Sequence, residues 1–158
     1  MKTLILLLFF LLLISGTTHA QSSFIQWQKA LGETGYDQAT SIIQTSDGGY
    51  IVAGYSNSTD GDVTGNHGQN DYWIVKLDSI GDTLWTKVLG GTSFDIANSI
   101  TQTSDGGYIV AGCSNSNDGD VTGSHGLSDY WIVKLSCLQF NAGNDVSIVC
   151  GDSVNLNA

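Results

Sequence analysis

The chain has 158 residues and combines five basic residues, all lysines, with 15 acidic residues, which gives a formal net charge of −10. Nucleic acids and anionic membrane surfaces both recruit a basic face. The acidic balance therefore argues against these two partner classes, and it is compatible with divalent cations, neutral glycans or simple solubility.

The first 20 residues have the pattern of a secretory signal peptide. A lysine at position 2 gives a positive start, residues 4–14 are all apolar, and Ala20 closes a cleavage site of small residues. The apolar run is about half the roughly 20 residues that a membrane span requires. We therefore expect cleavage after Ala20, a mature net charge of −11, no later membrane span, and a secreted or outer-surface location.

The mature chain opens with a strand-like segment at residues 25–31. Trp27, Lys29 and Leu31 recur at every second position, which is the period of a β-strand. The same pattern returns at residues 83–90, so we predict a strand at each place.

A hairpin follows in each half of the sequence. Residues 39–45 and 97–103 are strand-like, and each is followed by an Asp-Gly pair that favours a tight turn, at positions 47–48 and 105–106. Residues 50–54 and 108–112 are almost continuously apolar, which is typical of a strand covered on both faces. A long polar loop, residues 56–70 or 114–128, then leads to a last strand at 72–77 or 130–135.

The two halves are near-duplicates. Residues 44–77 return as residues 102–135, and only five of the 34 paired positions differ. A period of 58 residues with four antiparallel strands, no helical pattern and no proline fits one β-propeller blade. The fold prediction is an all-β protein in which residues 21–136 form an incomplete β-propeller of two four-stranded blades.

Tryptophan and tyrosine recur at alternating strand positions. We expect them to pack between the blades, although the same rings could also stack on sugars. The residues are Trp27, Trp73, Trp85, Trp131, Tyr50, Tyr72, Tyr108 and Tyr130.

The polar loops carry the candidate metal ligands. Calcium binds six to eight oxygens, and closely spaced Asp and Asn on a Gly-containing loop can supply them. The candidates are Asn57, Asp60, Asp62, Asn115, Asp118 and Asp120. Their spacing is not that of an EF-hand, and the alternative is that they cap turns of their own backbone. His67 and His125 stand alone in their loops, and we expect them to be hydrogen-bonded or solvated loop residues.

No catalytic constellation is evident. Asp71 and Asp129 precede Tyr-Trp pairs and could act on a sugar, but both recur with the scaffold, which favours a structural role. The sequence contains no Ser-His-Asp arrangement, phosphate loop or dinucleotide motif. We therefore predict a protein that is not an enzyme, with no catalytic residue and no cofactor other than calcium.

The repeated motifs TSDGGYIVAG, DGDVTG and DYWIVKL resemble the tandem extracellular repeats of secreted bacterial proteins that leave the cell through the type IX system. The resemblance covers residues 25–135. It implies propeller-like discs built from larger numbers of repeats. Some relatives carry an endoglucanase label, which the residues of this chain do not support by themselves.

The period stops after Leu135. Residues 137–158 are similar to the opening of the Ig-like or PKD-like domains that follow such repeats, and a truncated domain is expected there because a sandwich needs about seven strands. Cys113, Cys137 and Cys150 are an odd number for an oxidising compartment, so their pairing is open. Two blades cannot close a ring, which leaves a gene fragment or closure by oligomerisation.

The leading functional hypothesis is a secreted or cell-surface protein that binds or adheres through its polar loops. A glycan or a surface protein would be the partner. The alternatives are the non-catalytic part of an exported carbohydrate-active enzyme and a structural spacer.

Overall fold

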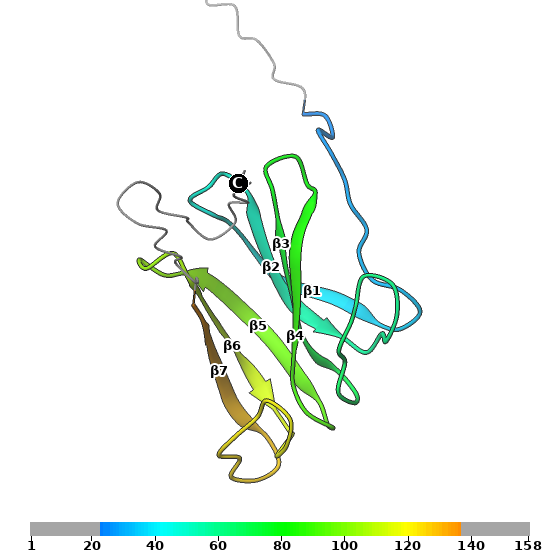
Figure 1. Cartoon of the computed structure of the whole chain (residues 1–158), viewed down its shortest axis with the longest axis vertical. Helices are drawn as coiled ribbons and strands as arrows, with labels where there is room; N and C mark the ends of the chain where they lie inside the picture. The colour runs from blue at the N-terminus through cyan, green and yellow to red at the C-terminus, as the bar shows by residue number, and fades with distance from the viewer. Residues whose placement is uncertain (1–22, 137–158) are drawn as a thin grey trace, which may run out of the picture.

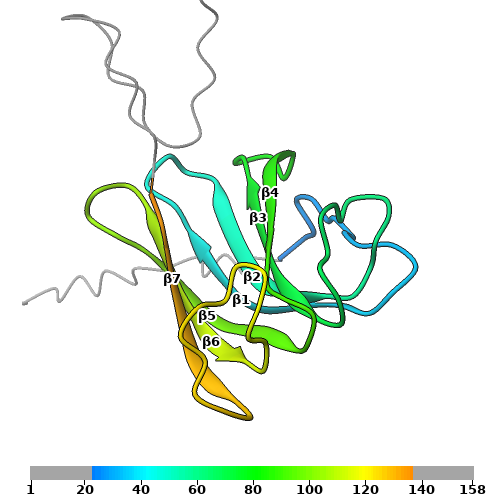
Figure 2. The same cartoon turned by 60° about the horizontal axis from the view of Figure 1, so that its bottom comes forward.

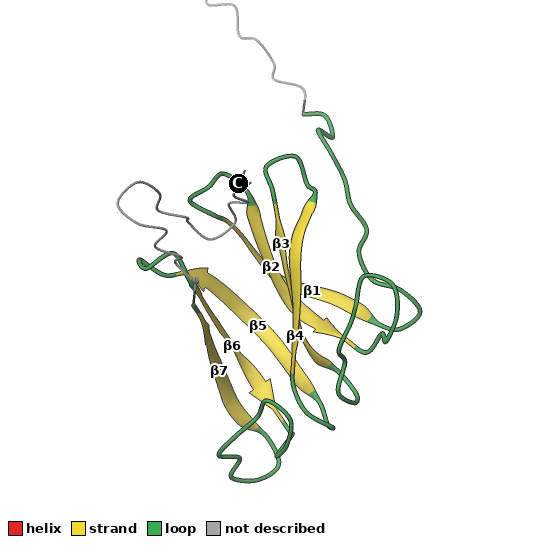
Figure 3. Ribbon diagram, in the orientation of Figure 1, coloured by secondary structure: helices red, strands yellow, loops and turns green. Residues whose placement is uncertain are grey.

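The computed structural model describes residues 23–136, which form seven β-strands in two antiparallel sheets (Figures 1 and 3). The strands are β1 (Asp37–Gln44), β2 (Tyr50–Ser56), β3 (Asp71–Leu77), β4 (Thr83–Leu89), β5 (Asp95–Gln102), β6 (Tyr108–Ser114) and β7 (Asp129–Leu135). This range contains no helix, and so no helix that could span a membrane. The all-β prediction is confirmed. The expected signal peptide and the expected Ig-like segment both lie outside the described residues.

Each sheet follows the order of the chain. The first sheet has the order β1-β2-β3-β4, and the second has β5-β6-β7. The Asp-Gly pairs form the expected turns: Gly48 and Gly106 have φ values of 83° and 81°, which a residue without a Cβ adopts at little cost. Within each turn the aspartate accepts a hydrogen bond from the backbone N–H two residues on, Asp47 from Gly49 and Asp105 from Gly107.

One strand predicted from the sequence is wrong. Residues 25–31 follow the strand pattern of β4, yet they form no strand. A strand requires a hydrogen-bonded neighbour, and the described part of the chain offers none to this segment. The segment is held by its side chains instead. The ring of Trp27 packs edge-on against Tyr50, with centroids 5.6 Å apart.

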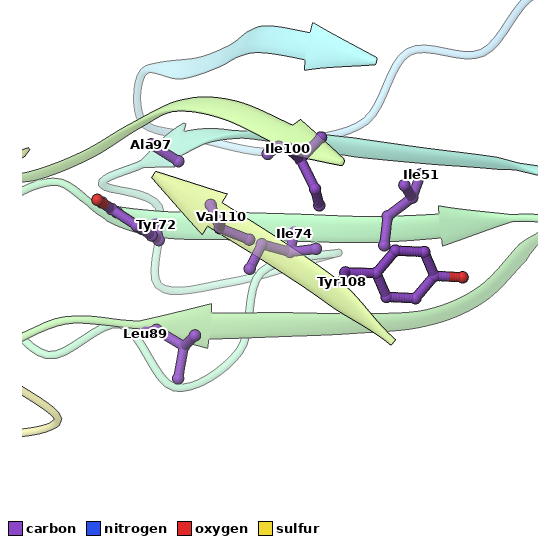
Figure 4. Packing of buried hydrophobic residues seen from close by; sticks show 9 residues of the cluster. Ile51, Tyr72, Ile74, Leu89, Ala97, Ile100, Tyr108 and Val110 are labelled. Atoms are coloured by element: carbon purple, nitrogen blue, oxygen red, sulfur yellow. The ribbon is translucent and has the colours of Figure 1, made fainter. Parts of the chain in front are cut away.

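The two sheets pack face to face, with β5 lying across β1 and β2 (Figure 2). The main core is the seam between them, shown in Figure 4. The first sheet contributes Ile51, Ala53, Tyr72, Ile74 and Leu89, and the second contributes Ala97, Ile100, Tyr108 and Val110. All nine are at most 7% exposed. The prediction of a strand covered on both faces is confirmed for β2, whose residues are all buried or half-buried. In β6 one face is left partly uncovered, and Ala111 is exposed.

A second core lies on the opposite face of the first sheet. Val63, Trp73, Val75, Leu77 and Val88 are buried there, beneath the partly buried Trp27 and Leu31. Trp73 and Val75 lie on one face of β3, and Ile74 on the other, as the alternation predicted. The N-terminal segment thus covers part of the outer face of the first repeat.

Identical strands have different surroundings in the two repeats. All seven residues of β3 are buried, whereas β7 has the same sequence and alternates between half-buried and exposed residues. The expectation that the aromatic residues form an inter-repeat core is confirmed for Tyr72 and Trp131, whose rings are in contact. It is wrong for Tyr130, which is 95% exposed because nothing described covers it.

Candidate functional site

Two long polar loops lie at the same end of their sheets, residues 57–70 before β3 and residues 115–128 before β7 (Figure 1). Each is anchored from beneath by a buried valine, Val63 or Val121, and by a buried serine, Ser58 or Ser116. Most of the other side chains in the loops are exposed. The loops therefore combine a fixed base with a polar, accessible tip.

In the second repeat the loop is fastened to residues 90–94, which connect β4 to β5. Asp118 accepts hydrogen bonds from the backbone N–H and the hydroxyl of Thr92, both at 2.8 Å. Asp120 accepts one from the N–H of Gly90 at 3.2 Å. The Thr92 backbone bond, reinforced by its side chain, lowers the pKa of Asp118. We call this set of contacts the aspartate clasp.

The first repeat has the same clasp, fastened to residues 32–36. Asp60 accepts from the hydroxyl of Thr34 at 3.1 Å, and Asp62 accepts from the N–H of Gly32 at 3.5 Å. Asn57 accepts from the N–H of Tyr36 at 2.6 Å through its side-chain oxygen. A backbone contact is common to both repeats: Asn57 donates its N–H to the carbonyl of Tyr36 at 3.2 Å, and its counterpart Asn115 donates to the carbonyl of Phe94 at 2.8 Å. The clasp therefore ties every polar loop to the segment that precedes its own sheet.

These contacts give a structural role to residues that the sequence offered as calcium ligands. Asn57, Asp60 and Asp62, like Asp118 and Asp120, all accept backbone N–H groups. These N–H groups belong to segments far away in the sequence, and not to the loops' own turns as the turn-capping alternative supposed. Within residues 23–136 no three His, Cys, Asp or Glu side chains are grouped to hold a metal ion. Calcium binding therefore remains a prediction. Thermal unfolding with and without the chelator EGTA tests it. A calcium-loaded loop would melt at a lower temperature once the chelator is added.

Two buried carboxylates meet beneath the first loop, at the junction of the repeats. Asp71 accepts from the N–H of His67 at 2.6 Å, and Asp95 accepts from the N–H of Gly91 and the hydroxyl of Ser116, both at 2.8 Å. Both carboxyl groups are 0% exposed. Gly90 lies between them, since a Cβ there would stand 2.3 Å from Asp71 Oδ1 and 2.7 Å from Asp95 Oδ2. Only glycine fits at that position.

Burial raises the pKa of Asp71, and the nearby charge of Asp95 raises it further, while hydrogen bonds from His67 act in the opposite direction. One oxygen of Asp71 and one of Asp95 have no hydrogen-bond partner among the described residues. The junction thus holds a costly pair of buried acids.

Asp71 and Asp129 each end a polar loop by holding its histidine. Asp129 accepts from the N–H of His125 at 2.6 Å, the same contact that Asp71 makes with His67. The Nδ1 atom of His67 also lies 3.0 Å from Asp71 Oδ2, as expected for a hydrogen-bonded loop histidine. The side chain of His125 is instead 86% exposed. These acids therefore fix the loop ends, which is the structural role that their recurrence favours.

Sequence reasoning missed a buried ion pair at the seam between the sheets. Lys76 is 0% exposed, and its Nζ lies 2.8 Å from Asp47 Oδ2. Burial alone would raise the pKa of Asp47, but hydrogen bonds from Lys76 and Thr45 outweigh it and lower the pKa overall. Burial, with the charge of Asp47, raises the pKa of the neighbouring Tyr108 to about 12. The sequence does carry one signal of this ion pair, because the same Asp and Lys recur at matching positions in both repeats.

A comparison with protein-family models finds none that matches this chain, and a comparison with curated proteins finds no matching relative. The resemblance of residues 25–135 to extracellular bacterial repeats therefore stays a prediction.

Proposed function

We propose that this chain is a secreted or cell-surface repeat protein that binds its ligand, without catalysis, through the two polar loops. The observation that supports this proposal most is the aspartate clasp. It holds the base of each loop by several hydrogen bonds and leaves polar side chains such as Thr64 and Thr122 exposed at the tip. A loop held in one shape loses less conformational entropy when it binds.

A neutral glycan is the ligand class that fits these loops. The chain is acidic and lacks arginine, which disfavours anionic ligands, and the loop tips offer hydroxyl, amide and imidazole groups for hydrogen bonds to sugar hydroxyls. The same loop occurs twice at one end of the molecule, so a polymeric ligand could contact both. Two linked contacts raise the overall affinity well above that of one.

The same proposal includes the architecture of the repeats, which we assign as propeller blades. Two antiparallel sheets that pack face to face, each built from one repeat, are what neighbouring propeller blades require. We treat the repeats as blades of the type found in secreted bacterial proteins, and residues 137–158 as the start of an Ig-like domain.

The proposal is tested by pull-down on insoluble neutral polysaccharides, with the bound fraction measured as protein concentration rises. Replacing both loop-tip threonines, Thr64→Ala with Thr122→Ala, should weaken binding by at least about threefold, because each hydroxyl that contacts sugar contributes roughly 0.5 to 1.5 kcal/mol. The matched control replaces two exposed serines at the opposite end of the sheets, Ser46→Ala with Ser104→Ala, and should bind like the parent.

Equal binding by the loop-tip variant and the serine control would contradict a role for the loops. Release of reducing sugar from the polysaccharide during the same incubation would contradict a purely binding function and favour the carbohydrate-active alternative.

A further inference from the structure

Among residues 23–136, each repeat leaves one apolar face uncovered, and the two open faces differ. The open front face belongs to the second repeat and consists of Ile109, Ala111, Tyr130 and Ile132 on β6 and β7. The open rear face belongs to the first repeat and consists of Ala39 and Ile42, which are exposed, with Tyr50 and Val52, which are half-buried beside Trp27. Tyr130 is 95% exposed and Ile132 is 62% exposed, while Ile42 is 57% exposed.

The same residues are buried wherever a second sheet covers them. The counterparts of Tyr130 and Ile132 in the first repeat are Tyr72 and Ile74, and both are 0% exposed. The counterpart of Ile42 in the second repeat is Ile100, which is 3% exposed. The seam inside the molecule is therefore a front face of one repeat packed on a rear face of the next. The described part of the chain therefore carries one uncovered copy of each face.

The open rear face is shaped to receive the open front face. A groove on the first repeat is lined by Trp27, Leu31, Ile42, Gly54 and Trp73. In the covered seam the hydroxyl of Tyr72 lies against Gly112. A Cβ on Gly112 would stand 2.6 Å from the hydroxyl oxygen, so only a glycine leaves room for it. Gly54 is the counterpart of Gly112, so the groove contains the corresponding seat for Tyr130 of another copy.

The strands are complementary as well. Within the described range the second sheet has three strands, with β7 at its edge, whereas the first has a fourth strand, β4, paired with β3. Residues 25–31 are the counterpart of β4 and have no strand partner in the described range. These residues already lie where β4 lies in the covered seam. Trp27 contacts Tyr50 with ring centroids 5.6 Å apart, just as Trp85 of β4 contacts Tyr108 with ring centroids 6.2 Å apart.

We propose that the occupant of these faces is a second copy of this chain, docked head to tail. The open front face of one copy packs into the groove of the next, and residues 25–31 of that next copy pair with β7 as the missing fourth strand. The register of β3 on β4 places Trp131 opposite Ala30, Ile132 opposite Lys29 and Val133 opposite Gln28. Because the two faces differ, the contact repeats until a ring closes or a filament grows. Propellers use about four to eight blades, so a ring would need roughly two to four copies.

The test is sedimentation equilibrium of the chain from Gln21 onward, in a reducing agent that prevents cross-links through its cysteines, over a wide range of concentrations. The parent should associate, either into a closed ring of roughly two to four copies or into longer filaments. Ile132→Asp removes the front face and Ile42→Asp removes the rear face, and each should raise the dissociation constant at least about tenfold, because a large apolar side chain is replaced by a charge. Tyr130→Ser is a second front-face variant, at a residue too exposed to affect folding. Ile80→Asp, at an exposed turn away from both faces, should associate like the parent.

Mixing the two single-face variants is the decisive measurement. Ile132→Asp retains a rear face and Ile42→Asp retains a front face, so an equal mixture should form a heterodimer and nothing larger. The proposal is overturned if the parent remains a monomer, as it would if residues 137–158 covered the front face. It is also overturned if either variant associates alone like the parent, or if the mixture stays monomeric.

Discussion

The hydroxyl of Tyr72, in the first repeat, donates a 2.9 Å hydrogen bond to the backbone carbonyl of Trp131, in the second. The rings of the two residues lie 4.6 Å apart between centroids, at 50°. Burial raises the pKa of the Tyr72 hydroxyl, which therefore remains a donor throughout the physiological range. This pair joins the two sheets through packing and hydrogen bonding together.

Tyr72→Phe should reduce the free energy of unfolding by about 1 kcal/mol, because it removes one buried hydrogen bond and retains the ring. Tyr130→Phe is the matched control in a dilute, monomeric sample, where the ring at this counterpart position is exposed, and it should change stability by less than about 0.5 kcal/mol. Urea unfolding of both variants measures the difference. Equal midpoints would show that the hydroxyl contributes nothing to the seam.

Gly68→Ala should lower stability by roughly 1 to 3 kcal/mol, because a Cβ there would stand 2.5 to 2.6 Å from backbone atoms of Thr92. The counterpart Gly126 has no atom within 4 Å of that position, so Gly126→Ala should be close to neutral. Thermal unfolding of the two variants compares the same substitution with and without a following repeat. A large loss in both would place the cause within the loop itself.

Asp47→Asn should cost roughly 2 to 3 kcal/mol, because it leaves the buried ammonium group of Lys76 without its counter-charge. Asp105→Asn changes the counterpart pair, in which the side chain of Lys134 is 39% exposed and can be solvated by water. Its effect should be much smaller. Chemical unfolding at neutral pH provides the comparison, and similar losses in both variants would contradict a special role for burial.

The pKa of Asp71 is raised in the folded state, so the native protein holds this proton at pH values where the unfolded chain has released it. Its contribution to stability should therefore improve as pH falls from neutral toward about 4, the unfolded value. Asp71→Asn should flatten this part of the stability curve. Urea unfolding between pH 7 and 4.5 measures the slope. An unchanged slope in the variant would mean that Asp71 does not titrate there.

Much of the fold could be predicted because the pattern is local. Alternation, apolar runs and turn signals together identified every strand from β1 to β7 to within about two residues at each end, and the Asp47-Gly48 turn follows from the need for positive φ. Residues 25–31 show the limit of such reasoning. Their pattern is that of a strand, but a strand exists only where another chain segment pairs with it.

The candidate site was predictable only in part, for a similar reason. The sequence indicated Asp60 and Asp118 as candidate calcium ligands. It could not show that these carboxylates accept hydrogen bonds from backbone N–H groups of a distant segment. The burial of Lys76 could not be predicted either, because Lys134 has the same place in an identical strand and is partly exposed. The first case depends on a contact between segments far apart in the sequence, and the second depends on the neighbouring sheet that covers Lys76.

The identical segments β3 and β7 offer a measurement that few proteins allow. Their seven side chains are the same, so intrinsic amide exchange chemistry is the same in both, and any difference in protection against deuterium reports only what surrounds each strand. The ratio of the two exchange rates therefore reads out the combined protection that β3 gains from its hydrogen bonds to β4 and from the sheet packed on it.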